Sequence, residues 1–101
     1  MTKITPADRS QAFLDFWMLI APLDAPAPVA EYPFAKSVGR RFRFDWAFPD
    51  NGKVAVEIDG GVWLPHGGRH GLDGDREKLN IAAVLGWRVF RFSPAMLERD
   101  P

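Results

Sequence analysis

Asp45 and Glu57 are the two side chains of this sequence best placed to do chemistry together. Apolar and polar residues alternate along residues 41–48 and again along residues 54–59, and this pattern is typical of two β-strands. A three-residue turn, Asp50-Asn51-Gly52, with its glycine in the left-handed conformation, joins the strands into a hairpin. That register sets Asp45 opposite Glu57, with their Cβ atoms about 5 Å apart. A two-residue turn would instead mix the polar and apolar faces of both strands.

Two carboxylates held so close repel each other, and a shared proton, a neighbouring base or a divalent cation must relieve the repulsion. Because the ligands are oxygens and the chain contains no Cys, a cation bound here would be Mg²⁺, with Mn²⁺ as a substitute, and not zinc or copper. The alternative is a solvent-facing sheet surface on which Asp45 and Glu57 pair with Arg43 or Lys53. The residues alone leave both interpretations open.

The charged residues are balanced in number but unevenly distributed. The chain has 13 basic and 13 acidic residues, so its net charge does not indicate a nucleic-acid-binding protein. Basic residues cluster first, and acidic residues dominate the stretch from Asp45 to Asp75 that follows. The basic cluster consists of Lys36, Arg40, Arg41 and Arg43. A basic patch beside an acidic cluster suits a metal-dependent nuclease, which must attract phosphates and bind a cation, although a solvated surface of mixed charge would look similar.

The rest of the sequence predicts the elements that position these residues. We expect a helix over 6–21, a Pro-rich connector over 22–30, an edge strand over 31–34, a helix beginning at Asp73 or Asp75 and running to Leu85, a strand over 87–92 and a short helix from Ser93-Pro94. The Gly-rich segment 60–71 predicts an irregular loop. In the first hairpin strand, Phe42, Phe44, Trp46 and Phe48 are expected on one face, and Arg41, Arg43, Asp45 and Ala47 on the other. The second helix is expected to pack through Leu79, Ala82, Ala83 and Gly86, and Trp17, Trp46 and Trp87 are expected in the core.

Length and composition favour one small domain covering residues 1–101. Hydrophobic residues make up 47% of the 101, which is enough for one modest core. Without Cys, the chain has neither a disulfide framework nor a thiolate zinc site. Its longest apolar stretch is too short to cross a bilayer and no signal peptide is recognisable, so we expect a cytoplasmic protein with no membrane partner.

The joint order of these motifs resembles the PD-(D/E)XK nuclease superfamily. The motifs are Arg-Phe-Arg-Phe-Asp45, then Val-Ala-Val-Glu57-Ile-Asp-Gly-Gly, then Asp75-x-x-Lys78-x-Asn80 before Gly86-Trp87-Arg88-Val89-x-Arg91. The likeness is greatest to small phage and prophage endonuclease-like proteins and weaker to very-short-patch repair endonucleases, and it covers residues 31–97. The resemblance implies an α/β fold with a small restriction-endonuclease-like αβββαβ core, in which helices flank a mixed sheet with a central β-hairpin. It makes residues 31–101 the catalytic core.

The resemblance also implies roles for the acidic residues. Asp45 and Glu57 would bind Mg²⁺ together with the main-chain carbonyl of Ile58. Glu31 would orient water or a second ion. The superfamily's usual lysine, two residues after the glutamate, is replaced here by Asp59.

The positive charge or general base that this lysine usually supplies must therefore come from another residue. Some members of the superfamily supply the lysine from the following helix, which makes Lys78 the favoured candidate for stabilising charge on the phosphate. The alternative is His70, acting from the Gly-rich loop as a general acid or base.

The activity that the resemblance implies is Mg²⁺-dependent endonucleolytic cleavage of DNA phosphodiester bonds. A metal-bound water would attack the phosphorus, and the basic residues Lys36, Arg40, Arg41 and Arg69 would hold the DNA backbone. Trp63 would stack on a base or wedge into a duplex, unless it packs in the core. The alternatives are a catalytically inactive nuclease-fold domain that binds DNA and a protein-interaction domain. Cleavage of both DNA strands would favour a homodimer.

Overall fold

The computed structural model describes residues 6–58 and 68–98, which form an α/β fold around a four-stranded mixed sheet. The elements, in chain order, are α1 (Pro6–Ile20), β1 (Val29–Pro33), the 3₁₀ helix η1 (Lys36–Val38), β2 (Arg43–Phe48), β3 (Val54–Ile58), α2 (Gly68–Val84), β4 (Arg88–Phe92) and α3 (Pro94–Glu98). The sheet order is β1-β2-β3-β4; β2 is antiparallel to both neighbours, and β3 is parallel to β4. The expected αβββαβ architecture with a central hairpin is confirmed.

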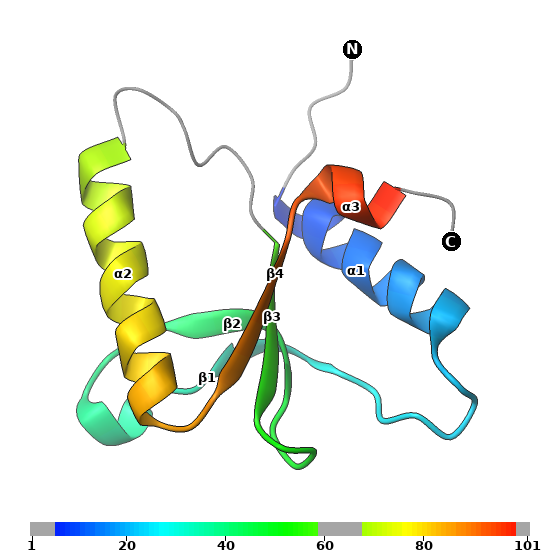
Figure 1. The fold of residues 1–101 in the computed structure, drawn as a ribbon, viewed down its shortest axis with the longest axis horizontal. Helices are drawn as coiled ribbons and strands as arrows, with labels where there is room; N and C mark the ends of the chain where they lie inside the picture. Colours follow the sequence, from blue (N-terminus) through cyan, green and yellow to red (C-terminus); the bar gives the residue numbers. More distant parts are fainter. Residues whose placement is uncertain (1–5, 59–67, 99–101) are drawn as a thin grey trace.

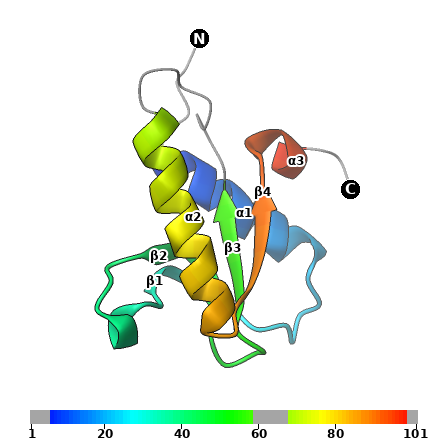
Figure 2. The same ribbon diagram turned by 60° about the vertical axis from the view of Figure 1, so that its left-hand side comes forward.

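Helices cover both faces of the sheet. In Figure 1 the sheet is seen nearly edge-on, with α2 on one side and α1 and α3 on the other, and in Figure 2 α2 descends to the left of β3 and β4. Each face has its own core. The α2-side core consists of Phe34, Ala35, Phe44, Ala47, Ala55 and Ala82, and the α1-side core of Phe13, Trp46, Val56, Ile58 and Leu97. Of the three tryptophans expected in the core, Trp46 is buried, whereas Trp17 and Trp87 are partly buried and pack against these clusters.

The first helix and the hairpin register agree with the sequence. α1 ends at Ile20, just before Pro22, and buries Phe13 against the sheet. In the hairpin, Trp46 pairs with Val56 and Phe48 with Val54, which is the register predicted for a turn with a left-handed Gly52; its φ is +85°.

The face assignment for β2 is wrong in its first half. Phe44 belongs to the α2-side core and Trp46 to the α1-side core, so they lie on opposite faces. The change occurs at Asp45, and the residue opposite it in β1, Glu31, has a φ of +52°. Because helices cover both faces, the strand must deliver large apolar side chains to each, which a strict alternation of aromatic and polar residues cannot do.

The predicted start of α2 is wrong, and its predicted packing face is right at Ala82 but not at Ala83. The helix begins at Gly68 and therefore includes residues 68–71, which were expected in an irregular loop. The low helix propensity of glycine does not prevent a helix there, because it costs only about 1 kcal/mol per residue. The packed stripe is Ile81, Ala82 and Leu85, whereas Ala83 is exposed.

Gly86 has a conformational role and not the expected packing role. Its φ is +87°, it follows the last turn of α2, and a Cβ atom built there would meet nothing within 4 Å. The glycine therefore ends the helix in the left-handed conformation that side chains disfavour.

No helix in the described part of the chain is long and apolar enough to cross a membrane.

Candidate active site

Asp45 and Glu57 lie where the pairing between β2 and β3 stops. The last backbone pair is Trp46 with Val56. Beyond it, the Asp45 amide donates a hydrogen bond to Glu57 Oε2 at 2.9 Å, and the Ile58 amide donates to Asp45 Oδ2 at 2.7 Å. Each carboxylate is thus anchored to the backbone of the opposite strand. The predicted juxtaposition of the two acids is present, and backbone amides hold it.

Lys78 brings a positive charge to this pair from α2. Its ammonium contacts Glu57 Oε1, and it lies 5.9 Å from the centre of the Phe44 ring. The side chains of Lys78 and Glu57 are only 17% and 10% exposed. Lys78 is positioned there because it lies one turn before Ile81 and Ala82, on the side of α2 that packs on the sheet.

The electrostatics of Glu57 reflect a conflict between burial and pairing. Burial is the largest influence and raises the pKa of the Glu57 carboxyl above its ordinary value of 4.5. The Lys78 ammonium opposes this increase through its hydrogen bond and its charge, and the Asp45 amide also opposes it, whereas the Asp45 carboxylate adds to it. The ionised form of Glu57 is therefore only partly compensated, and a further cation would stabilise it.

Arg91 and Asp75 extend the site as a pair that the sequence does not predict. Arg91 is the residue of β4 that pairs with Glu57 in the parallel register. Its guanidinium donates to Asp75 Oδ2 at 2.9 Å, which links β4 to α2. The sequence gives one weak indication of this pair, which is that polar residues recur periodically in both β4 and α2. Asp75 lies within α2 and not at its start as expected, and its carboxylate pairs with Arg91.

The other acidic candidate lies on the neighbouring strand. Glu31 is opposite Asp45 in β1, between the pairs Ala30–Trp46 and Tyr32–Phe44, and its side chain is exposed. The strand register therefore brings Glu31 beside the Asp45–Glu57 pair. Asp59 follows Glu57 in sequence but is outside the described residues.

The predicted DNA-binding residues are distributed over η1 and the segment after it. Lys36, Arg40 and Arg41 are exposed. Arg40 already has partners within the protein. Its guanidinium pairs with Glu77 of α2 at 2.6 Å and lies 4.9 Å from the centre of the Phe42 ring. The side chains of Arg69 and His70, in the first turn of α2, and the whole of Trp63 are outside the described part of the structure. Lys53, considered as a partner of the two acids, donates instead to the Leu85 carbonyl.

The donor set at Asp45 and Glu57 fits Mg²⁺. Within residues 6–58 and 68–98, no group of three or more His, Cys, Asp or Glu side chains could hold a metal ion, and Asp45 and Glu57 are a pair of carboxylates. Mg²⁺ is commonly bound in this way, by one or two carboxylates together with water and substrate phosphates. Each carboxylate oxygen that accepts one hydrogen bond retains a second lone pair for a cation.

Comparison with known proteins adds no further assignment. No family model, curated protein or solved structure matches the chain. The function is therefore inferred from the geometry of Asp45, Glu57 and Lys78 and from the resemblance of the sequence motifs.

Proposed function

We propose that this chain is a Mg²⁺-dependent endonuclease that hydrolyses DNA phosphodiester bonds. The observation that carries the proposal is the convergence of Asp45, Glu57 and Lys78, from three different elements, on one partly buried spot. Two carboxylates next to a single ammonium combine a cation-binding pair with a positive charge that can face a phosphate.

Each residue has a distinct part in the proposed reaction. Bound Mg²⁺ would supply an activated water and would neutralise charge on the phosphate. Asp45 and Glu57 would hold the cation, with the Ile58 carbonyl as a further oxygen ligand. Lys78, on its flexible four-carbon stem, turns from Glu57 towards the phosphate and stabilises the charge that develops there. Glu31, on the adjacent strand, orients the attacking water.

DNA would approach over η1 and the segment that follows it. Lys36 and Arg41 bind phosphates there, whereas Arg40 is partly committed to Glu77. This contact is independent of sequence, because it depends on charge alone.

The test is a cleavage assay on a panel of DNA structures, comprising nicked, mismatched, branched, duplex and single-stranded forms, with Mg²⁺ and with a chelator. We expect cleavage of at least one form with Mg²⁺ and none with the chelator. Asp50→Asn is the matched control, because Asp50 is an exposed acid in the adjacent turn and should leave cleavage unchanged. If the wild type cleaves none of these forms with either Mg²⁺ or Mn²⁺, the proposal is wrong.

The assignment of the cationic role to Lys78 has its own test. Loss of a positioned charge at a reacting phosphate costs about 3 kcal/mol, or roughly a hundredfold in rate. Lys78→Met should show this loss under conditions in which the variant is folded, and His70→Ala should retain cleavage. The reverse result would transfer the role to His70.

A second function is favoured by one specific contact. Lys78 already places a positive charge against Glu57, as it would in a nuclease-fold domain that binds DNA without a metal. Salt-dependent DNA binding without cleavage would identify this binding domain, and the absence of any salt-dependent binding would favour a protein-interaction domain.

A further inference from the structure

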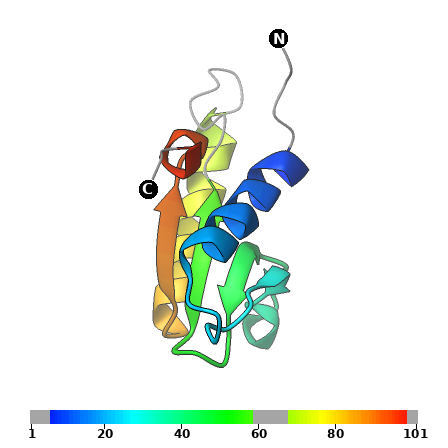
Figure 3. The same cartoon turned by 90° about the vertical axis from the view of Figure 1, so that its right-hand side faces the viewer.

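The first helix covers only part of the sheet face on which it packs. α1 crosses the sheet obliquely in Figure 3, in which β4 forms the left-hand edge of the sheet. On this face Val56 of β3 is 3% exposed, whereas Phe90, which is beside Val56 in the parallel register, is 53% exposed. A groove therefore remains between the helix and the outer strand.

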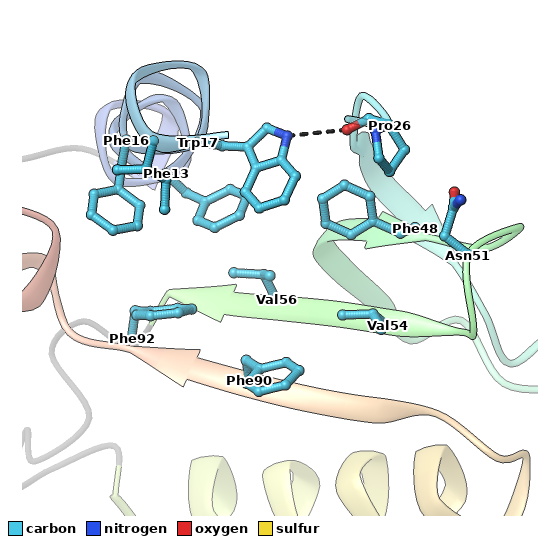
Figure 4. A pocket seen from close by; sticks show the side chains of 11 residues that line it. Phe13, Phe16, Trp17, Pro26, Phe48, Asn51, Val54, Val56, Phe90 and Phe92 are labelled. Carbon is cyan, nitrogen blue, oxygen red and sulfur yellow. Dashed lines mark hydrogen bonds between the residues drawn. The ribbon is translucent and has the colours of Figure 1, made fainter. Parts of the chain in front are cut away.

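This groove has a volume of about 340 Å³ and an almost wholly apolar lining (Figure 4). Its aromatic side chains are Phe13, Phe16, Trp17, Phe48, Phe90 and Phe92. The helix contributes the stripe from Phe13 to Ile20, which spans about 10 Å at 1.5 Å per residue. The groove therefore offers a long apolar wall rather than a small isolated patch.

The lining has few polar groups. They include Asn51 and the indole N–H of Trp17, which already donates to the Pro26 carbonyl at 3.0 Å (dashed line in Figure 4). An ordered water needs about two to four polar partners, and a nucleobase needs partners for its hydrogen-bonding edge. The lining side chains do not supply such a set, so the groove suits a hydrocarbon group better than water or a base.

A positive charge lies at one end of the groove. Side chains alternate along β4, so Arg88 shares a face of the sheet with Phe90 and Phe92. In the register with β3, Arg88 is beside Val54, which lines the groove. Arg88 is exposed, and its guanidinium forms no ion pair with a residue of 6–58 or 68–98. An apolar groove that ends at such a cation is complementary to an anion with an apolar tail.

We propose that the groove binds a medium-chain fatty acid, with its hydrocarbon chain between α1 and the sheet and its carboxylate paired with Arg88. An apolar cavity of about 150 Å³ holds benzene, so a groove of about 340 Å³ accommodates a chain of roughly ten to twelve carbon atoms. The guanidinium matches a carboxylate because it can donate two parallel hydrogen bonds. The groove lies on the face of the sheet opposite α2 and Lys78, and its ligand does not depend on the proposed cleavage activity.

The first test follows the wild-type chain by NMR while decanoate is added below the concentration at which it forms micelles. The methyl resonances of Ile20, Val54 and Val56, which line the groove, should shift and saturate at one decanoate per chain. Ile81 and Val89 are the internal control, because they pack against the α2-side core, and their methyl resonances should stay in place.

The second test separates the charge from the chain. Decylammonium has the same chain and the opposite charge, so the wild type should bind it more weakly than decanoate. Arg88→Gln should weaken decanoate binding about fivefold and abolish this preference, because the pair is exposed. Arg76→Gln is the matched control, since it removes an exposed arginine from α2, on the other face, and should keep the preference. Octanoate lacks two methylene groups and should bind about fifteenfold more weakly than decanoate.

The third test changes the wall of the groove without changing its charge. Phe90→Gln should weaken the binding of decanoate and of decylammonium alike, because it removes an aromatic ring that both chains contact. Leu19→Gln is the matched control, because Leu19 is 69% exposed on α1 and does not line the groove, and it should bind both ligands as the wild type does.

Four results would overturn the proposal. One is a wild type whose groove methyl resonances do not shift until decanoate forms micelles, which would indicate a surfactant surface as the partner. Another is an equal shift at Ile81 and Val89, and a third is equal affinity for decanoate and decylammonium. The last is a wild type that sediments as a dimer and binds no decanoate, which would assign the groove to a second copy of the chain.

Discussion

Lys78→Met should destabilise the fold much more than loss of a surface ion pair would. Methionine keeps the apolar stem of Lys78 beside Phe44 but removes the charge next to Glu57. The two side chains are only 17% and 10% exposed. Removing one partner of a buried pair costs about 3 to 5 kcal/mol, and the lower value applies because Glu57 can take up a proton. At about 4 to 8 °C per kcal/mol for a domain of this size, unfolding should then occur about 12 to 24 °C lower at neutral pH.

The effect should depend on pH in a defined direction. Because burial raises the pKa of Glu57 in the folded chain, its titration favours folding most below pH 4.5, and this contribution is lost as the pH rises through the folded-state pKa. Without Lys78 the pKa of Glu57 should rise further, since the ammonium acts to lower it. The deficit of Lys78→Met should therefore be largest at neutral pH and should shrink below pH 4.5.

The assay is denaturant unfolding of wild type, Lys78→Met, Glu57→Gln and the double variant, with carboxyl ¹³C NMR to follow Glu57. Arg76→Met is the control on the same helix, because the Arg76–Asp73 pair is 72% and 74% exposed and should contribute less than about 1 kcal/mol. The reasoning is refuted if Lys78→Met and Arg76→Met lose equal stability at neutral pH, or if the Glu57 pKa does not rise in Lys78→Met.

Three further predictions concern the site and the backbone. Asp45→Asn and Glu57→Gln should each reduce Mg²⁺-dependent cleavage about a hundredfold or more while circular dichroism shows a folded chain, and wild-type turnover by either would contradict the metal assignment. Replacing both Lys36 and Arg41 by Ala should reduce the slope of log affinity for DNA against log salt concentration by about 2. An unchanged slope would show that these residues do not bind DNA. Gly86→Ala should lower the free energy of unfolding by about 1 kcal/mol and Gly86→Asn by less, because the position is left-handed and open; equal losses would point to packing instead.

The hairpin could be predicted because local chemistry determines it. The Asp50-Asn51-Gly52 turn and the polar alternation of both strands allow one register, which the structure has. The packing of β2 on both faces could not be predicted in the same way. Alternation in the sequence assumes a regular strand, and the change of face at Asp45 depends on the neighbouring β1, in which Glu31 has a positive φ.

Only part of the site could be predicted from the sequence, for a similar reason. Asp45 and Glu57 are adjacent through a short hairpin, whereas the role of Lys78 follows from the family resemblance and not from helix periodicity. Arg91 lies beside Glu57 only because β4 pairs with β3 in parallel after α2 has crossed the sheet. Pairing across such a distance leaves no local signal, since several registers satisfy the same apolar pattern.

The hydrogen bonds at the end of the hairpin make two backbone amides into reporters of the carboxylates. The Asp45 amide donates to Glu57, and the Ile58 amide donates to Asp45. A proton or a cation that binds either carboxylate withdraws electron density from the oxygen that accepts the amide, and so weakens that hydrogen bond. The amide resonances of Asp45 and Ile58 would therefore shift together when the site is occupied, before any substrate is present. The same coupling means that occupancy changes how firmly β2 and β3 are held together at this end of the sheet.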